Sequence, residues 1–138
     1  MNALRILIVD DHVVVREGLA RILSGTGEGW SVSEASGGFQ ALDRLRREPA
    51  DLVIVDLSMP GMGGLELIRR IRSEFGRTAV LVLSMHAEEQ YAIRAFKAGA
   101  NGYLTKDTAS TELLKAVRKV MAGGAHVSAD LAERVVLQ

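Results

Sequence analysis

The chain has 138 residues, no cysteine and 17 basic against 17 acidic side chains, so its formal net charge at pH 7 is zero. The lack of cysteine excludes a disulfide framework and a thiolate metal site, and the balanced charge gives no overall basic field for nucleic acid or an anionic membrane. With 48% hydrophobic residues, a chain of this length is expected to form one domain that builds its core unaided.

The amino terminus, MNALRILIVDDH, has a short apolar run that ends in two acids, which is unlike a secretory signal. No apolar stretch in the chain reaches the roughly 18 residues that a membrane-spanning helix needs. We therefore expect a cytoplasmic protein that does not enter a membrane.

Five short apolar runs follow one another along the chain, at residues 5–9, 30–35, 52–55, 79–83 and 102–105. The first, third and fourth are continuously apolar and rich in Val, Ile and Leu, which is typical of strands buried on both faces of a parallel sheet. The segments between the runs have apolar residues at helical spacing. Strict alternation of strand and helix predicts a doubly wound α/β domain with five βα units.

The glycines at 123–124 predict the end of the fifth helix, because glycine readily adopts the left-handed conformation found there. We expect residues 1–122 to form the domain and residues 123–138 to be a linker or a short tail helix. A tail of that length is too short for a helix-turn-helix unit, so we expect no effector DNA-binding domain and no nucleic-acid binding in this chain.

Polar side chains follow four of the predicted strands. The first strand is followed by two acids, the third by an acid, the fourth by a hydroxyl and the fifth by an amine. These residues are Asp10, Asp11, Asp56, Ser84 and Lys106. The carboxyl ends of parallel strands meet at one edge of the sheet, where such folds bind their ligands. Taken singly, each residue is as consistent with a helix cap or a solvated surface group as with a functional role.

Taken together, the three carboxylates would repel one another and raise one another's pKa unless a cation lay among them. Oxygen ligands of this kind suit Mg²⁺, which leaves other coordination positions to water and phosphate. The lysine and the hydroxyl supply the charge and the hydrogen bond that phosphate oxygens need. The sequence therefore predicts a Mg²⁺ site that receives a phosphoryl group.

Four segments carry a resemblance to a known family: ILIVDDH, LVIVDLSMPGMGG, LVLSMH and GANGYLTKD. The chain resembles a response-regulator receiver domain over residues 4–121. The LSMH segment, the KD pair and the tail AGGAHVSADLAERV are similar to the NarL/FixJ branch, whose full-length members carry a carboxyl-terminal helix-turn-helix domain. The resemblance implies the flavodoxin-like receiver fold, with the sheet order 2-1-3-4-5.

The resemblance also implies roles for individual residues. Asp56 matches the phosphoacceptor, and Lys106 would pair with a phosphate oxygen. Ser84 matches the switch hydroxyl, and Tyr103 matches the switch aromatic that turns inward when the hydroxyl moves to the phosphate. The Mg²⁺ ligands would be the carboxylates of Asp10, Asp11 and Asp56, directly or through water, and the backbone carbonyl of Ser58.

The partners implied by the resemblance are a sensor histidine kinase and small phosphodonors. The chain would catalyse only its own phosphorylation and dephosphorylation, and its output would be transcription through a domain outside this sequence. Phosphorylation is expected to change self-association, giving a homodimer. One candidate surface comprises residues 91–97, 102–105 and 111–121, and the competing surface combines residues 111–121 with the first helix near Val14 and Leu19.

Several residues depart from the commoner receiver pattern or invite other interpretations. Asp107 stands where many receivers have proline, and the large Met85 is expected to shield the acyl phosphate in part from water. The histidines at 12, 86 and 126 show no paired metal-ligand spacing, which predicts surface positions or positions behind the site and disfavours a histidine metal site.

Three alternatives compete with a phosphorylated receiver. A phosphatase of the haloacid-dehalogenase kind needs an aspartate two residues after its nucleophile, but Ser58 occupies that position. A nucleotide-binding protein needs a glycine-rich phosphate loop, which the turn after the first strand lacks. A stand-alone receiver or a non-phosphorylated scaffold acting by protein contacts remains, although the complete set of site residues argues against the scaffold.

Overall fold

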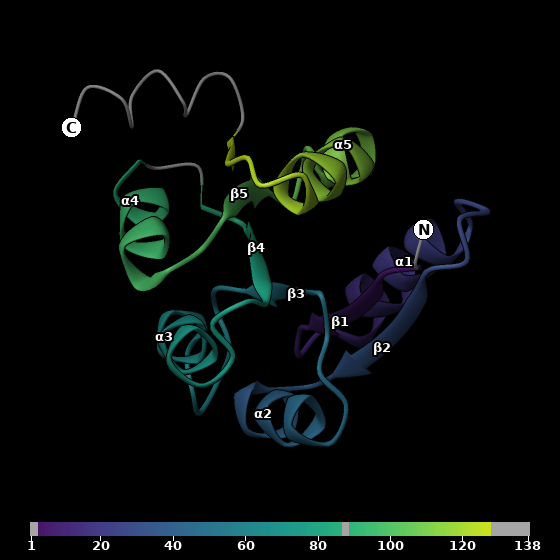
Figure 1. Ribbon diagram of the computed structural model, residues 1–138. Coiled ribbons are helices and arrows are strands. Elements are labelled where there is room, and N and C mark those ends of the chain that lie inside the picture. The colour runs from purple at the N-terminus through teal and green to yellow at the C-terminus, as the bar shows by residue number, and fades with distance from the viewer. Residues whose placement is uncertain (1–2, 87–88, 128–138) are drawn as a thin grey trace.

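The chain folds around one parallel sheet of six strands with helices on both faces (Figure 1). The computed structural model describes residues 3–86 and 89–127. The strands lie in the order β2-β1-β3-β4-β5-β6, and each neighbouring pair is parallel. Their bounds are β1 Arg5–Val9, β2 Ser31–Ala35, β3 Leu52–Asp56, β4 Ala79–Ser84, β5 Gly102–Thr105 and β6 His126–Val127.

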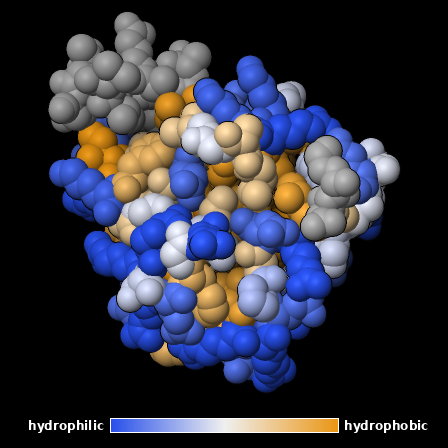
Figure 2. Space-filling model, in the orientation of Figure 1, coloured by the Kyte–Doolittle hydropathy of each residue, from blue (hydrophilic) through white to orange (hydrophobic). Residues whose placement is uncertain are grey.

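Five helices connect the strands, and they divide between the two faces of the sheet. Their bounds are α1 Val13–Ser24, α2 Gly38–Arg47, α3 Gly64–Glu74, α4 Glu89–Ala98 and α5 Ala109–Met121. Helices α1 and α5 cover one face, and α2, α3 and α4 cover the other (Figure 1). In the same view, hydrophilic side chains dominate the outline of the molecule, with hydrophobic ones showing between them (Figure 2).

Alternate residues of the central strands feed two separate cores. In β1, Ile6 and Ile8 pack with α1 and α5, whereas Leu7 and Val9 pack with α2 and α3. Each fully buried side chain of this size contributes about 1.5–3 kcal/mol relative to an exposed one. Burial on both faces explains why these strands are continuously apolar in sequence.

The structure confirms the predicted fold class and the order of its first five strands, and it differs at two places. Strand β2 starts at Ser31 rather than at residue 30, and it is only partly buried because it forms the sheet edge. Strand β6 was not predicted, and it carries the sheet past the domain end expected at residue 122. After Gly123, whose φ is +93°, the chain turns and lies beside β5. The predicted tail helix falls outside the described residues.

None of the helices in residues 3–86 and 89–127 is long and apolar enough to span a membrane.

Candidate functional site

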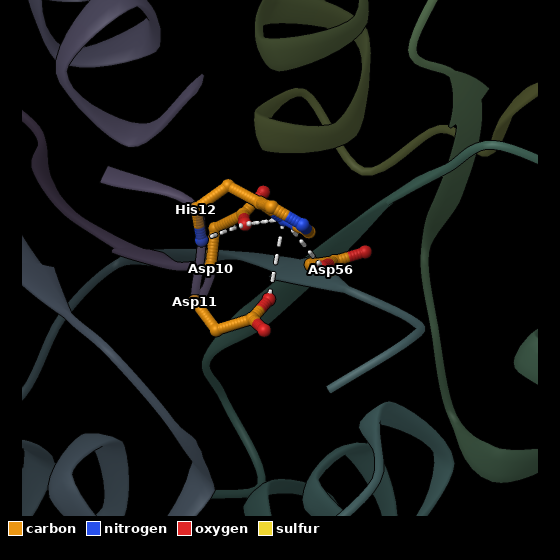
Figure 3. Close-up of side chains that lie close together, drawn as sticks. All are labelled: Asp10, Asp11, His12 and Asp56. Carbon is orange, nitrogen blue, oxygen red and sulfur yellow. Dashed lines mark hydrogen bonds and ion pairs between the residues drawn. The ribbon is translucent and has the colours of Figure 1, made fainter. Parts of the chain in front are cut away.

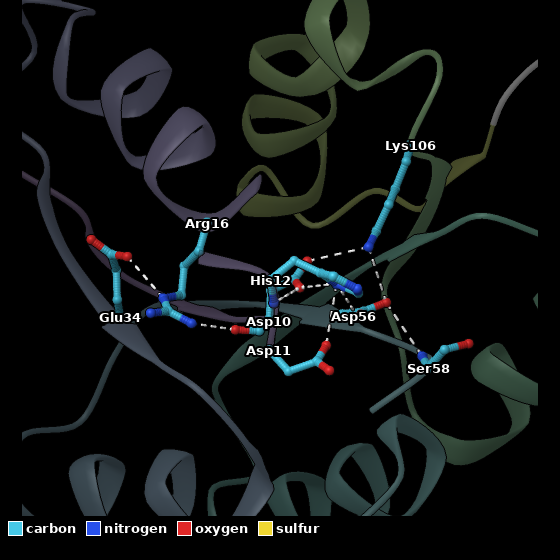
Figure 4. A network of polar contacts seen from close by, with 8 residues as sticks. All are labelled: Asp10, Asp11, His12, Arg16, Glu34, Asp56, Ser58 and Lys106. Atoms are coloured by element: carbon cyan, nitrogen blue, oxygen red, sulfur yellow. Dashed lines mark hydrogen bonds and ion pairs between the residues drawn. The ribbon is translucent and has the colours of Figure 1, made fainter. Parts of the chain in front are cut away.

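The carboxylates predicted from the strand ends meet in one pocket at the carboxyl edge of the sheet (Figure 4). Asp10 follows β1 and Asp56 ends β3, and both side chains are only 2% exposed. Lys106, just after β5, places its Nζ 3.3 Å from Asp10 Oδ2 and 3.4 Å from Asp56 Oδ1. One ammonium group thus bridges two buried carboxylates, while Asp11 lies beside them in a more exposed position.

Backbone contacts fix the orientation of these acids. The Asp10 N–H donates to the carbonyl of Ala35 at 3.2 Å, which continues the β1–β2 pairing by one residue. The Ser58 N–H donates to Asp56 Oδ1 at 3.3 Å, which places Ser58 at the site as predicted. The role predicted for the Ser58 carbonyl stays a prediction.

Arg16 and Glu34 hold the backbone of Asp10 in place, and neither was predicted from the sequence. Arg16 comes from the first turns of α1, and its Nη1 donates to the backbone carbonyl of Asp10 at 2.5 Å. Its Nε donates to Glu34 Oε1 on β2 at 2.9 Å. The pair ties the peptide that carries the acids to the edge strand (Figure 4). The pattern at 16 and 34 resembles ordinary surface charge, so only the fold reveals the connection.

His12 lies at the same pocket and reaches all three carboxylates. Its Nδ1 is 3.0 Å from Asp10 Oδ1, 3.3 Å from Asp11 Oδ1 and 3.9 Å from Asp56 Oδ2 (Figure 3). Its backbone N–H also donates to Asp10 Oδ1 at 2.8 Å. The predicted surface position is confirmed, since the His12 side chain is 57% exposed, but the sequence did not predict that the ring also contacts the three acids.

The pocket holds more negative charge than its neighbours neutralise. Burial raises the pKa of Asp56 above its ordinary value, the negative charge of Asp10 raises it further, and Lys106 opposes both. Within the described part of the chain, Asp10 Oδ2, Asp11 Oδ1 and Asp56 Oδ2 have no hydrogen-bond partner. The ion pair of Lys106 with Asp10 Oδ2 compensates only part of this charge.

The donors present in the pocket fit a divalent cation. Unpaired, buried carboxylate oxygens are the groups that a hard ion such as Mg²⁺ coordinates. A cation among them would offset the repulsion that raises the pKa of Asp56. Asp10, Asp11 and Asp56 are therefore the residues that could hold a metal ion.

The two predicted switch residues are connected through the backbone of His86. Ser84 ends β4 and its Oγ accepts a hydrogen bond from the His86 N–H at 3.0 Å. Tyr103, on β5, is fully buried, and its hydroxyl donates to the His86 carbonyl at 2.7 Å. The Lys106 N–H donates to the Ser84 carbonyl at 2.8 Å. The tyrosine is therefore turned inward here, and one short segment joins it to the pocket.

One further expectation fails. His126 was expected on the surface or behind the site, but it is buried in β6 beside β5, and burial lowers its pKa. The reason lies in the course of the backbone after α5, which the local sequence does not specify. Met85 is 79% exposed, and the partial shielding of an acyl phosphate predicted for it stays a prediction.

Comparisons with known proteins agree with this geometry. Residues 6–118 match the family model described as the response regulator receiver domain. The chain is 37% identical over 134 residues to the response regulator UvrY of Escherichia coli strain K12, covering 97% of this chain and 62% of UvrY. It is 41% identical over 133 residues to the transcriptional activator protein ExaE of Pseudomonas putida, covering 96% of this chain and 62% of ExaE. The chain thus spans about three-fifths of these relatives.

Solved structures give the same picture. A two-component response regulator of the LuxR family from Aurantimonas sp. SI85-9A1 superposes with a TM-score of 0.92 at 37% identity, over 99% of this chain and 97% of that one. The isolated receiver domain of RcsB from Salmonella enterica serovar Typhimurium was solved with the phosphomimetic BeF3⁻. It superposes with a TM-score of 0.85 at 25% identity, over 96% of this chain and 98% of that one.

Proposed function

Since the chain belongs to the family of response-regulator receiver domains of two-component signalling, we propose that it accepts a phosphoryl group on Asp56. One observation carries this proposal. Asp56 is buried at the end of β3, its Oδ2 has no hydrogen-bond partner within the described residues, and Lys106 lies within 3.4 Å of its other oxygen. A buried carboxylate with one oxygen free of hydrogen bonds and the other oriented by an ammonium group is suited to attack phosphorus.

The reaction forms one bond and breaks another. An Asp56 oxygen attacks the phosphorus of a phosphohistidine on a sensor histidine kinase, or of a small phosphodonor, and the bond from phosphorus to the donor breaks as the acyl phosphate forms. The donor leaves with the electron pair and takes a proton from solvent. The carboxylates of Asp10, Asp11 and Asp56, directly or through water, and the Ser58 carbonyl would hold Mg²⁺, which would supply positive charge to offset the phosphoryl oxygens. Lys106 pairs with a phosphoryl oxygen.

The phosphoryl group then changes the contacts of the switch segment. Its new negative charge draws Lys106 and the Ser84 hydroxyl toward it. Because the His86 N–H donates to Ser84 Oγ and the His86 carbonyl accepts from Tyr103, movement of Ser84 alters the support of the tyrosine. The repacking reaches α4 and β5, and it changes self-association of the domain.

The proposed partners are a sensor histidine kinase, small phosphodonors and a second copy of the chain. The protein catalyses its own phosphorylation and dephosphorylation and turns over no other substrate. Its output is transcriptional regulation in the cytoplasm, through a helix-turn-helix domain outside this sequence. The name of ExaE as a transcriptional activator supports that output.

Phosphorylation by acetyl phosphate with Mg²⁺, followed by intact-mass and peptide mass spectrometry, tests the proposal. We expect one added phosphate on the wild-type chain, mapped to Asp56 and abolished in Asp56→Asn. The matched control is Asp107→Asn, which removes an exposed aspartate next to Lys106 and retains the adduct. An adduct that persists in Asp56→Asn contradicts the assignment, and a wild-type chain without an adduct favours the non-phosphorylated scaffold.

A further inference from the structure

His12 places a nitrogen donor inside a pocket whose other donors are oxygens. We propose that His12 Nδ1 is a fourth protein ligand of this pocket, and that the pocket therefore prefers a divalent first-row transition metal ion to Mg²⁺. The inference rests on the metal site proposed above and specifies which ion its donor set selects.

The distances from His12 Nδ1 to the three carboxylates fit one coordination sphere. In an octahedral ion with bonds of about 2.1 Å, adjacent donors lie about 3.0 Å apart and opposite donors about 4.2 Å apart. From His12 Nδ1, the distances to the Asp10 and Asp11 oxygens are 3.0 and 3.3 Å, which match adjacent positions. The distance to Asp56 Oδ2 is 3.9 Å, which approaches that of opposite positions. All four ligand atoms lie within 4.8 Å of one another, a bound somewhat wider than an octahedral sphere, so the side chains would draw closer together around a bound ion (Figure 3).

A second observation points to a ligand at these residues. Asp56 Oδ2 and Asp11 Oδ1, the oxygens that face His12 Nδ1, have no hydrogen-bond partner in the described part of the chain, and the Asp56 side chain is almost fully buried. The other buried carboxylate oxygen without a hydrogen bond, Asp10 Oδ2, has only its ion pair with Lys106. The backbone of His12 is held in place as well. Its N–H donates to Asp10 Oδ1, and its carbonyl accepts from the Arg16 N–H at 3.0 Å, at the start of α1.

The chemistry of the imidazole explains the preference. Mg²⁺ binds oxygen and retains water, whereas Mn²⁺, Co²⁺, Ni²⁺ and Zn²⁺ accept imidazole nitrogen, with affinities that rise toward Cu²⁺. A metal ion binds Nδ1 only when that nitrogen carries no proton, so the neutral ring would then carry its proton on Nε2. The His12 side chain is 57% exposed, which leaves the ring open to solvent.

Titration of Ni²⁺ and Mg²⁺ into the metal-free chain tests the ligand directly. His12→Phe keeps a flat ring at an exposed position and removes only the nitrogens, so the fold persists, as circular dichroism will verify. We expect this variant to bind Ni²⁺ at least about tenfold more weakly and Mg²⁺ with an affinity within about threefold of wild type. The matched control is His86→Phe, which removes an imidazole outside the pocket and leaves both affinities as in wild type.

A spectroscopic measurement identifies the bound atom. In the Mn²⁺-loaded wild-type chain, electron spin echo envelope modulation should show coupling to an imidazole nitrogen, and this coupling should be lost in His12→Phe but kept in His86→Phe. If His12→Phe weakens both ions equally or neither, or if the nitrogen coupling survives, His12 is not a ligand. These outcomes leave the Asp56 adduct unaffected, so they are distinguishable from failure of the proposed phosphorylation.

Discussion

Polar side chains lie at both ends of the parallel strands, here called the amino edge and the carboxyl edge of the sheet, and the two sets differ in their hydrogen bonding. At the amino edge, β3, β4 and β5 are preceded by Asp51, Thr78 and Asn101, and each of these side chains has a hydrogen-bond partner. At the carboxyl edge, Asp10 and Asp56 lie in equivalent positions, and each leaves a buried oxygen without one. A buried polar group costs free energy unless it is paired, so the polar groups at the amino ends of the strands stabilise the fold, whereas those at the carboxyl ends carry an uncompensated cost.

Arg72 shows how completely the amino edge is satisfied. Its guanidinium donates to the carbonyls of Gly76, Thr78 and Gly99 and to Asn101 Oδ1, over distances of 2.7–3.1 Å. The same Asn101 oxygen accepts the Val80 N–H at 2.8 Å. One side chain thus connects the end of α3 to the starts of β4 and β5. At the other ends of the strands, Lys106 and His12 face three carboxylates, and buried carboxylate oxygens there remain without a hydrogen bond within the described residues.

The largest loss of stability is expected when the Arg72 hydrogen bonds at the amino edge are removed. Arg72→Met keeps much of the aliphatic stem but leaves three carbonyls without their donor and Asn101 Oδ1 with only the Val80 N–H, and it should lower the free energy of unfolding by about 3 kcal/mol. Urea unfolding measures this, with Arg69→Met, on the exposed side of the same helix, as the control. A loss below about 1 kcal/mol would mean that the network contributes little.

A smaller loss of stability is expected when the ammonium group of Lys106 is removed from the carboxyl edge. Lys106→Met leaves Asp10 and Asp56 without the ammonium that pairs with both, and should destabilise the metal-free fold by about 1–2 kcal/mol. Saturating Mg²⁺ should remove much of this difference, because a second positive charge then faces the same oxygens. Equal destabilisation with and without Mg²⁺ would show that the ion and Lys106 do not share these carboxylates.

The smallest effect concerns His126, a buried residue of β6 whose Nε2 lies 3.9 Å from Glu112 Oε1. Neither ring nitrogen has a hydrogen-bond partner within the described residues, and burial lowers the pKa of the ring below 6.5. As pH falls below about 6.5, the unfolded chain binds a proton that the folded chain does not, so the fold loses stability in that range. Glu112 opposes this shift, and Lys115 and Lys119 reinforce it.

His126→Leu should therefore change stability by less than about 1 kcal/mol at pH 8 and reduce the loss between pH 7 and pH 5.5. Unfolding in urea at these pH values, compared with wild type, gives the difference. An unchanged pH slope would show that the other ionisable groups, rather than His126, set the pH dependence.

Sequence patterns predicted the fold well because its strands are short, apolar and buried on both faces. The same logic located Asp10, Asp56 and Lys106, since strand ends converge at one edge in any parallel sheet. Strand β6 was not predicted because a strand of two residues is too short to show an apolar pattern in the sequence. Its pairing with β5 depends on the turn at Gly123.

The supporting contacts of the site could not be predicted from spacing. Arg16 and Glu34 are 18 residues apart, and they meet only because α1 crosses from β1 to β2. His12 directly follows Asp10 and Asp11, and this adjacency in the sequence could have predicted that the ring lies near the acids. Paired-histidine spacing does not detect a single histidine among carboxylates.

The central claim is that the carboxyl edge carries unneutralised charge that a cation relieves, and Asp56→Asn tests it most directly. Burial raises the pKa of Asp56, so at pH 7.5 the ionised side chain destabilises the metal-free fold, and this penalty vanishes well below pH 4, where the carboxyl is protonated in both states. Calorimetric melting at pH 7.5 should therefore show Asp56→Asn melting above wild type without Mg²⁺. With Mg²⁺ at a hundredfold excess over its Kd, wild type gains about 2.7 kcal/mol and should melt above the variant. A variant that is less stable without Mg²⁺, or that gains as much from Mg²⁺ as wild type, would contradict the account.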